Sequence, residues 1–441
     1  MSARTIAVTI LGLAVLLIFS FPTVTPAQTD RDALNAMYTA SATIPTNIKG
    51  VHTFPAAPAG FDPLQAADMD LARYGYPPRP PQQSNPEDYA RWSKAVKAMK
   101  HAPDPNKLIE MPFSSRPMLP GPASKETAGI LGAPSTKTSG NWSGFANTNK
   151  NTKWSKSTSF YEVVSEFNTP VAQQPFGACD GTTDVEVSWN GIDGFNNGDV
   201  VQGGSLSQAK CVSNVTTTSY CDWVEWFPSY GILCVITPSG PGDDVYVATL
   251  DTGGGGTTGT SQTVCLTDET LNMGSCYLLD WLSGPGLVGD SAEYIVERPG
   301  YGCGVNICLV PLANYVADFW AYSEAWTFTE YDAYVSKGTK TPNYPGSTAT
   351  TTYLINMMND QFTETISSAT AEGDYGIAFF DENCANTGGC TPNRAHSSLS
   401  RMQEAWSKRE APCVTIVTRR ARSRNAGCCP LIESDFVSAG V

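Results

Sequence analysis

Short runs in which apolar and polar residues alternate dominate the chain between residues 131 and 390. Examples are Val185–Trp189, Asp244–Ala248 and Phe319–Tyr322. Clusters of turn-forming residues such as Ser239–Gly242 separate the runs. Alternation with a period of two is typical of strands with one buried face, and little helical periodicity accompanies it. The pattern predicts one all-β domain over residues 131–390, built as an antiparallel sandwich or barrel.

The N-terminus carries an apolar run from Ile6 to Phe19, followed by small residues and prolines up to Ala27. This arrangement is typical of a secretory signal peptide, which we assign to residues 1–27. The alternative is a membrane anchor, but the run is shorter than the roughly 20 residues of a spanning helix. We therefore expect a secreted, extracellular protein that has no membrane association after signal cleavage.

Residues 28–130 are rich in proline, as in Tyr76–Pro81. Such sequence is semi-rigid, and we expect no large core in it. Two helices are predicted, over Pro63–Tyr74 and from Pro86 to Met99. The second helix carries a basic stripe of Arg91, Lys94, Lys97 and Lys100. The stripe is either a solvated helix face or the face of a removable pro-segment that covers an acidic cleft.

Charge separates the predicted β domain from the rest of the chain. Residues 131–390 contain 28 Asp and Glu but only eight Lys and Arg, a formal charge of −20. A negative domain disfavours nucleic acid and anionic membranes as partners. It suits a protein that works in acid, where protonation reduces the repulsion between carboxylates, although simple solubility explains it equally well.

Cysteines also indicate an oxidising compartment. Ten of the 13 lie within residues 131–390, where Cys265/Cys276 and Cys303/Cys308 are close enough in sequence to be bridged. The spacings do not fit a zinc site, so we expect no metal. Residues 391–441 are rich in arginine and contain no strand pattern. They are interpreted as a basic, disordered tail or the product of a shifted reading frame, with nucleic-acid binding as a weaker alternative.

Histidine placement restricts the chemistry of the β domain. His52, His101 and His396 all lie outside the segment that the pattern predicts to be folded. A Ser-His-Asp triad or a Cys-His pair is therefore excluded there. Hydrolysis in this domain would have to use carboxylates, amides and bound water.

The segment Ala292–Glu297 offers carboxylates on a strand. Alternation places Glu293, Ile295 and Glu297 on one face, with Glu293 and Glu297 about 13 Å apart at the rise of a strand. That separation is too large for a close pair, so Glu297 needs a partner from another strand. Gln202, in Val201–Gly204, is a candidate because its amide donates a hydrogen bond without titrating.

Five short motifs occur in a fixed order. They are Asn141–Gly144, Trp189–Gly194, Val201–Gly204, Trp223–Pro228 and Ala292–Glu297. Together they resemble the glutamic peptidases, or eqolisins, over residues 140–380. The resemblance implies a two-sheet antiparallel β-sandwich of the concanavalin A-like kind, preceded by a signal and a partly helical pro-segment. It also implies a monomer that needs no cofactor.

Residue roles follow from the same resemblance. Gln202 and Glu297 match the catalytic glutamine and glutamate. Positions that line or support the cleft are Trp142, Trp189, Asp193, Glu225, Trp226 and Glu293. The chain departs from the family where Phe227 replaces a usual tyrosine and Leu206 a usual aspartate.

The activity implied is that of an acid endopeptidase. Glu297 and Gln202 would activate a water against peptide bonds of polypeptide substrates, and the pro-segment, residues 28–130, would act as an intramolecular inhibitor. Two alternatives stay open at this point. One is a glycosidase with paired carboxylates such as Glu225 and Glu297, and the other is a non-catalytic sandwich that binds sugars or peptides.

Overall fold

The computed structural model describes residues 36–38, 41–83, 85–121, 135–148, 159–174, 179, 181–253, 260–303, 306–315, 318–327, 351–372 and 376–382. All of them belong to one compact unit, Met1–Asn393. The predicted signal peptide, residues 1–27, and the predicted tail, residues 391–441, lie outside the described residues. No helix within the described ranges is long and apolar enough to cross a membrane.

Strands make up most of the described chain, as the alternating pattern predicted. The strands are β1 Ile44–Pro45, β2 Val51–Thr53, β3 Ile109–Glu110, β4 Ser135–Ser139, β5 Trp142–Thr148, β6 Phe160–Asn168, β7 Ala172–Gln173, β8 Thr183–Ile192, β9 Val200–Val212, β10 Val215–Phe227, β11 Leu233–Ile236, β12 Asp244–Leu250, β13 Ser261–Asp268, β14 Met273–Asp280, β15 Ser291–Glu297, β16 Gly300–Cys303, β17 Asn306–Leu309, β18 Asn314–Tyr315, β19 Asp318–Thr327, β20 Thr351–Met358, β21 Thr365–Glu372 and β22 Gly376–Asp381.

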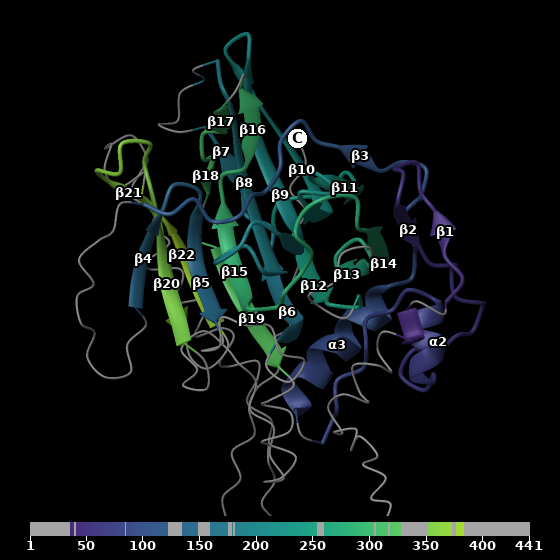
Figure 1. The fold of residues 1–441 in the computed structure, drawn as a ribbon. Coiled ribbons are helices and arrows are strands. Elements are labelled where there is room, and N and C mark those ends of the chain that lie inside the picture. The colour runs from purple at the N-terminus through teal and green to yellow at the C-terminus, as the bar shows by residue number, and fades with distance from the viewer. Residues whose placement is uncertain are drawn as a thin grey trace, which may run out of the picture. The chain divides into compact units, whose positions relative to one another are not determined.

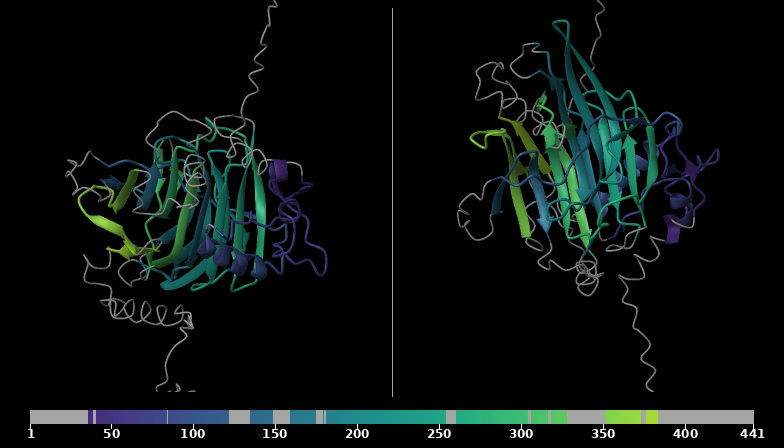
Figure 2. Two further views of the ribbon diagram at one scale, coloured as in Figure 1. Left: turned by 90° about the horizontal axis from the view of Figure 1, so that it is seen from below. Right: turned by 45° about the horizontal axis from the view of Figure 1, so that its top comes forward.

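Two large antiparallel sheets form a sandwich. The first sheet pairs its strands in the order β11-β10-β9-β8-β15-β5-β20. From β20 the pairing continues through β21 and β22 into the second sheet, β19-β6-β12-β13-β14-β2. Strands β6 and β12 lie against β8 and β9, so the second sheet covers one face of the first (Figures 1 and 2).

Each face of the first sheet has its own apolar core. The core between the sheets contains Phe145, Val201 and Tyr294. The opposite face carries a second core that includes Trp142, Trp189 and Ile295. Tyr294 and Ile295 are neighbours on β15 and point to opposite sides, which confirms the predicted alternation. The second core lies on the outer face of the first sheet, where Phe113, Met111 and Met118 from the N-terminal region pack against it.

The N-terminal residues are folded onto the sandwich. Strand β2 pairs with β14, and β3 pairs with β11. Helices α2 (Asp68–Arg73) and α3 (Pro86–Ala98) correspond to the two predicted helices, although α2 is shorter than expected. The side chain of Asn85 caps α3 by accepting the Asp88 N–H at 3.0 Å.

The region has a small apolar cluster of its own, in which Trp92 is fully buried beside Leu71 and Val96. This cluster is smaller than the large core that the sequence argued against. One expectation for the region is wrong, because His52 is part of the fold: it lies in β2 with Nε2 3.2 Å from Asp280 Oδ2. His101 forms a bridge to Met273, while His396 lies outside the described residues.

Four disulfides link the described strands and loops. The two pairs that close spacing made possible, Cys265–Cys276 and Cys303–Cys308, are both formed, although the sequence left the connectivity open. Two more, Cys179–Cys211 and Cys221–Cys234, join residues that the sequence did not pair. Cys221–Cys234 ties β10 to β11 at the edge of the first sheet, so this edge is held covalently next to the cleft.

Candidate active site

Glu297 ends β15, and its side chain is completely buried. Its Oε1 accepts hydrogen bonds from the Arg116 N–H at 2.9 Å and from Asn141 Nδ2 at 3.0 Å. Its Oε2 accepts from Trp189 Nε1 at 2.9 Å and from the Ser115 hydroxyl. Burial raises the pKa of Glu297 to about 8, although the four hydrogen bonds act to lower it. In this arrangement the carboxyl is protonated in acid.

Gln202 on β9 lies directly across from Glu225 on β10. Gln202 Nε2 donates to Glu225 Oε2 at 3.1 Å, and Gln202 Oε1 accepts from the Ser115 hydroxyl at 3.2 Å. Glu225 Oε2 also accepts the Ser115 N–H at 3.0 Å. Burial, followed by the nearby charge of Glu297, raises the pKa of Glu225 well above its usual range.

The Ser115 hydroxyl joins the two residues that the resemblance assigned as catalytic. Its oxygen contacts Glu297 Oε2 and Gln202 Oε1, from strands 95 positions apart in sequence. One hydroxyl carries one proton, so it can donate to only one of the two oxygens at a time. A protonated Glu297 can donate to the Ser115 oxygen while the hydroxyl donates to Gln202 Oε1. The raised pKa of Glu297 is consistent with that arrangement.

Two tryptophans form a wall beside the carboxylate. Trp142 and Trp189 meet edge to face, with ring centroids 5.0 Å apart. Trp189 donates to Glu297, while Trp142 Nε1 donates to the Arg116 carbonyl at 2.8 Å. Alternation on β5 and β8 places both rings on the cleft face, as expected from their motifs.

The other predicted site residues lie farther from this centre. Asp193 accepts the N–H groups of Val288, Gly289 and Asp290, and so fixes the loop that leads into β15. Trp226 faces the core between the sheets and donates to Asp199. Glu293 is fully buried four residues before Glu297, and burial raises its pKa well above the usual range.

Trp226 therefore supports the first sheet from behind and does not line the cleft. In the described parts of the chain, no group of His, Cys, Asp and Glu has the arrangement of a metal site.

An N-terminal segment, residues 109–121, runs over the outer face of the first sheet and covers Glu297 and Gln202, and we call it the covering segment. We use the word cleft for the surface that this segment covers. Met111 N–H donates to the Ile232 carbonyl at 2.9 Å, and Ser114 exchanges two backbone hydrogen bonds with Gly300, both at 2.8 Å. Met118 N–H donates to the Gly194 carbonyl at 3.0 Å. In Figure 1 this blue segment leaves β3 and crosses the face of the first sheet toward β4. Its backbone lies along the cleft as an extended peptide.

Sequence reasoning missed three residues that contact Glu297. Asn141 stands beside Trp142 in a motif that was recognised, so its position was available as a signal. Ser115 and Arg116 had no such signal, because nothing local in the covering segment indicates which surface it crosses.

Comparisons with known proteins identify the family. The family model described as the peptidase A4 family matches residues 140–378, just over half of the chain. A search among curated proteins found no significant match.

Solved structures of the same kind are similar. Scytalido-glutamic peptidase with a transition-state analog inhibitor is 17% identical, with a TM-score of 0.41, over 55% of this chain and 98% of its own. Aspergilloglutamic peptidase from Aspergillus niger is 20% identical, with a TM-score of 0.34, over 45% and 99%. SCP-B, an eqolisin in complex with the tripeptide Ala-Ile-His, is 15% identical, with a TM-score of 0.39, over 55% and 98%. On the family match, the chain belongs to the peptidase A4 family, the glutamic peptidases or eqolisins.

Proposed function

We propose that this protein is a secreted acid endopeptidase in which Glu297 and Gln202 act on one bound water. Membership of a peptidase family implies polypeptide substrates. The observation that most directly supports the dyad is the Ser115 oxygen, which has the size of a water and contacts both side chains.

The chemistry needs Glu297 as general base and then as general acid. A water in the place of the Ser115 oxygen loses a proton to ionised Glu297 and attacks the peptide carbonyl. The Gln202 amide then donates to the oxygen that becomes negative, a contribution typically worth about 3–4 kcal/mol. This requires Gln202 Nε2 to turn from its present partner, Glu225. Protonated Glu297 finally returns the proton to the leaving nitrogen.

The proposed acid optimum depends on uncovering the cleft. While the covering segment is seated, the pKa of Glu297 is about 8 and the carboxyl cannot act as a base in acid. When the segment leaves, water reaches the carboxylate and the cost of burial decreases. The pKa then falls toward the usual value of a glutamate, roughly 4.3, and the base is ionised in mild acid.

The backbone contacts of the cleft favour a peptidase over the alternative glycosidase. Glu225 and Glu297 both border the Ser115 oxygen, as a pair of catalytic carboxyls would. However, Glu225 accepts a peptide N–H, and Glu297 accepts the next N–H along the chain. Trp142 donates to the following carbonyl. The two carboxylates and the indole N–H thus pair with successive N–H and C=O groups of a polypeptide backbone, which a sugar chain does not have.

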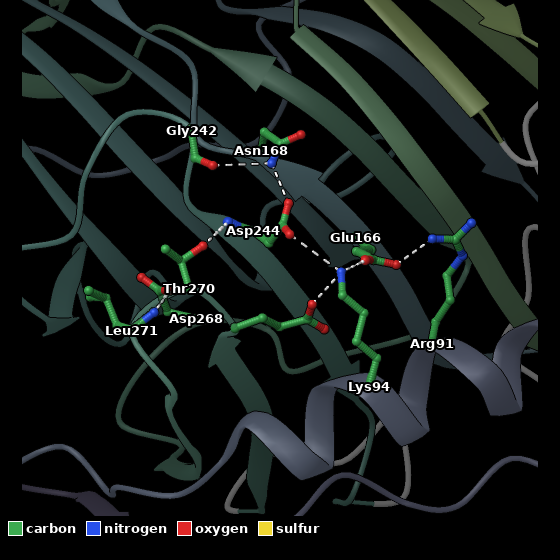
Figure 3. A network of polar contacts seen from close by, with 10 residues as sticks. Arg91, Lys94, Glu166, Asn168, Gly242, Asp244, Asp268, Thr270 and Leu271 are labelled. Atoms are coloured by element: carbon green, nitrogen blue, oxygen red, sulfur yellow. Dashed lines mark hydrogen bonds and ion pairs between the residues drawn. The ribbon is translucent and has the colours of Figure 1, made fainter. Parts of the chain in front are cut away.

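The N-terminal region is proposed to be an inhibitory pro-segment with two parts. The covering segment fills the cleft, and α3 anchors the region to the second sheet. Arg91 and Lys94 on α3 pair with Glu166 at 2.6 and 2.5 Å (Figure 3). Lys94 also lies 2.5 Å from Glu269 and 3.5 Å from Asp244.

The basic stripe contacts the acidic domain away from the dyad. Arg91 and Lys94 contact acids on the second sheet and its edge, while Lys97 and Lys100 line a separate hollow beside Phe61 and Tyr76. The ion pairs of Arg91 and Lys94 are with Glu166, Glu269 and Asp244, and none is with Glu297 or Gln202. Backbone pairing and the Ser115 hydroxyl, with Arg116, cover the dyad instead.

The proposed maturation cut lies between Pro117 and Ser139, which includes residues 122–134 outside the described ranges. Removal of residues 28–130 would release a monomeric enzyme. Secretion is supported by the four disulfides, since such bonds persist in oxidising compartments.

An activity assay on denatured casein tests the proposal. The full-length protein is incubated at pH 2–7 with and without pepstatin, and the Glu297→Gln variant is compared with the wild type. The exposed Glu364→Gln substitution on the same sandwich serves as a matched control. We expect pepstatin-insensitive cleavage in acid that only Glu297→Gln abolishes. Cleavage by Glu297→Gln at the wild-type rate would overturn the assignment.

A further inference from the structure

We propose that the Ser115 hydroxyl takes the place of the attacking water, so that the covering segment binds in the position of a substrate but stays uncut. This regulation rests on the proposed function of Glu297 and Gln202. It makes one side chain of the pro-segment responsible for latency at the dyad itself.

The backbone position identifies the bond that is held. Ser115 N–H donates to Glu225, and the Arg116 N–H donates to Glu297 Oε1 at 2.9 Å. The Arg116 carbonyl accepts from Trp142 Nε1 at 2.8 Å and from Asn141 Nδ2 at 3.2 Å. The nitrogen of the Ser115–Arg116 bond therefore already lies against the group that would protonate it.

The Ser115 hydroxyl excludes the water that would act as the nucleophile. Ser115 is fully buried, and its oxygen occupies the position between Glu297 Oε2 and Gln202 Oε1. A water cannot share that position with the hydroxyl. Gln202 Nε2 is also turned toward Glu225, away from the role of oxyanion donor. The Ser115–Arg116 peptide bond therefore lies beside Glu297, but a water cannot attack it and the Gln202 amide is not oriented to stabilise the oxyanion.

Removal of the hydroxyl should turn the inhibitor into a substrate. In Ser115→Ala a water can enter between the dyad residues. This water also hydrates Glu297 and reduces the cost of burial that raises its pKa, so the carboxyl can ionise and act as a base although the segment is seated. Its oxygen bonds to the carbonyl carbon of residue 115, and one of its protons goes to Glu297. The bond from this carbon to the Arg116 nitrogen then breaks as Glu297 passes the proton to that nitrogen. The products are a carboxyl at residue 115 and an amine at Arg116.

The test compares self-processing of full-length wild type, Ser115→Ala and Ser114→Ala. Ser114→Ala removes a neighbouring hydroxyl but keeps the Ser115 contacts. We expect Ser115→Ala alone to generate a new N-terminus at Arg116, whereas the wild type and Ser114→Ala should show complete loss of this product. The double variant Ser115→Ala/Glu297→Gln should not be cut.

A second format does not depend on folding of the variant. Synthetic peptides of residues 109–121 with Ser or Ala at position 115 are added to acid-processed enzyme. The Ser peptide should inhibit and stay intact, whereas the Ala peptide should be cut after position 115. Equal cleavage of the two peptides, or equal processing of Ser115→Ala and wild type, would overturn the role of the hydroxyl. If the processed wild type itself cannot cleave casein, the proposed function fails instead.

A separate observation identifies a modification site. The chain contains two Asn-X-Ser/Thr sequences, at Asn141 and Asn214. Asn141 is fully buried and donates to Glu297, so it cannot carry a glycan. Asn214 is exposed in the two-residue turn between β9 and β10, where Ser213 and Asn214 both have positive φ. We infer that Asn214 carries an N-linked glycan if the chain follows the secretory route proposed above.

The neighbourhood of Asn214 supports this assignment. Val212 and Val215 flank the turn and are 49% and 59% exposed, and a glycan would shield these apolar side chains. The protein secreted by a eukaryotic host is digested with an endoglycosidase and weighed. We expect a mass loss that disappears in both Asn214→Gln and Thr216→Ala. Secreted protein with unmodified Asn214 would overturn the site, whereas failure of secretion would count against the proposed localisation.

Discussion

Glu166→Gln should release α3 from the sandwich at neutral pH. The Glu166 side chain is only 5% exposed and receives both Arg91 and Lys94. Burial by itself would raise the pKa of Glu166, but the charges of Arg91 and Lys94 outweigh it and lower the pKa. A lowered pKa means that the stabilising contribution is present above the usual pKa of glutamate. It is lost as the pH falls through the lowered value.

The size of the effect follows from the exposure of the partners. A hydrogen bond to a charged group is worth about 1.5–3 kcal/mol, which we assign to Arg91. Lys94 is 50% exposed, so solvent reduces its share to about 0.5–1 kcal/mol. The sum of about 2–4 kcal/mol corresponds to roughly 30- to 1000-fold in the equilibrium between docked and undocked α3.

Limited proteolysis of α3 measures this equilibrium. Each variant is made in the Glu297→Gln background, so that self-processing does not intervene, and is digested at pH 7 and at several lower pH values. We expect Glu166→Gln at pH 7 to be cut within α3 as readily as its parent is in acid. The control is Asp244→Asn, because Asp244 is 44% exposed and 3.5 Å from Lys94, and it should change protection little.

Two results would refute the reasoning. One is a Glu166→Gln protein that is as well protected at pH 7 as its parent. The other is an Asp244→Asn protein with an equal loss of protection, because the buried position of Glu166 would then have no special importance.

The remaining predictions concern the dyad and the buried acids. Glu297→Gln should abolish casein cleavage while leaving the circular dichroism spectrum unchanged, and turnover at the wild-type rate would contradict its role as base. Gln202→Ala should lower kcat by about 10²–10³ with little change in KM, whereas Gln208→Ala on the same strand should not. Burial, followed by the charges of Asp268 and Asp243, raises the pKa of Asp222, so its stabilising contribution is present in acid and lost as pH rises through the raised value. Asp222→Asn in the Glu297→Gln background should therefore raise the thermal midpoint at pH 8, by about 2–4 °C per kcal/mol, and hardly at pH 4. A midpoint raised equally at both pH values would contradict this.

Local patterns in the sequence determined much of the fold. Alternation in Ala292–Glu297 placed Ile295 and Glu297 on one face and Tyr294 on the other, and the two cores confirm it. The same alternation places Glu225 and Trp226 on opposite faces, so the position of Trp226 behind the cleft could have been predicted. Close spacing also made Cys265–Cys276 and Cys303–Cys308 possible pairs, but only the structure decided the connectivity, because the two hairpins bring their strands together.

Tertiary structure decided what covers the cleft and where the basic helix docks. Ser115 reaches Glu297 from 182 positions away, and Arg91 reaches Glu166 from 75. No periodicity connects residues so distant in the chain. These contacts form because Glu225 and Glu297 on the first sheet accept backbone N–H groups of the covering segment. On the second sheet, Glu166 accepts the basic side chains of α3. Alternation fixes the face of a strand on which a side chain lies, whereas the partner of that face depends on how distant strands and segments pack together.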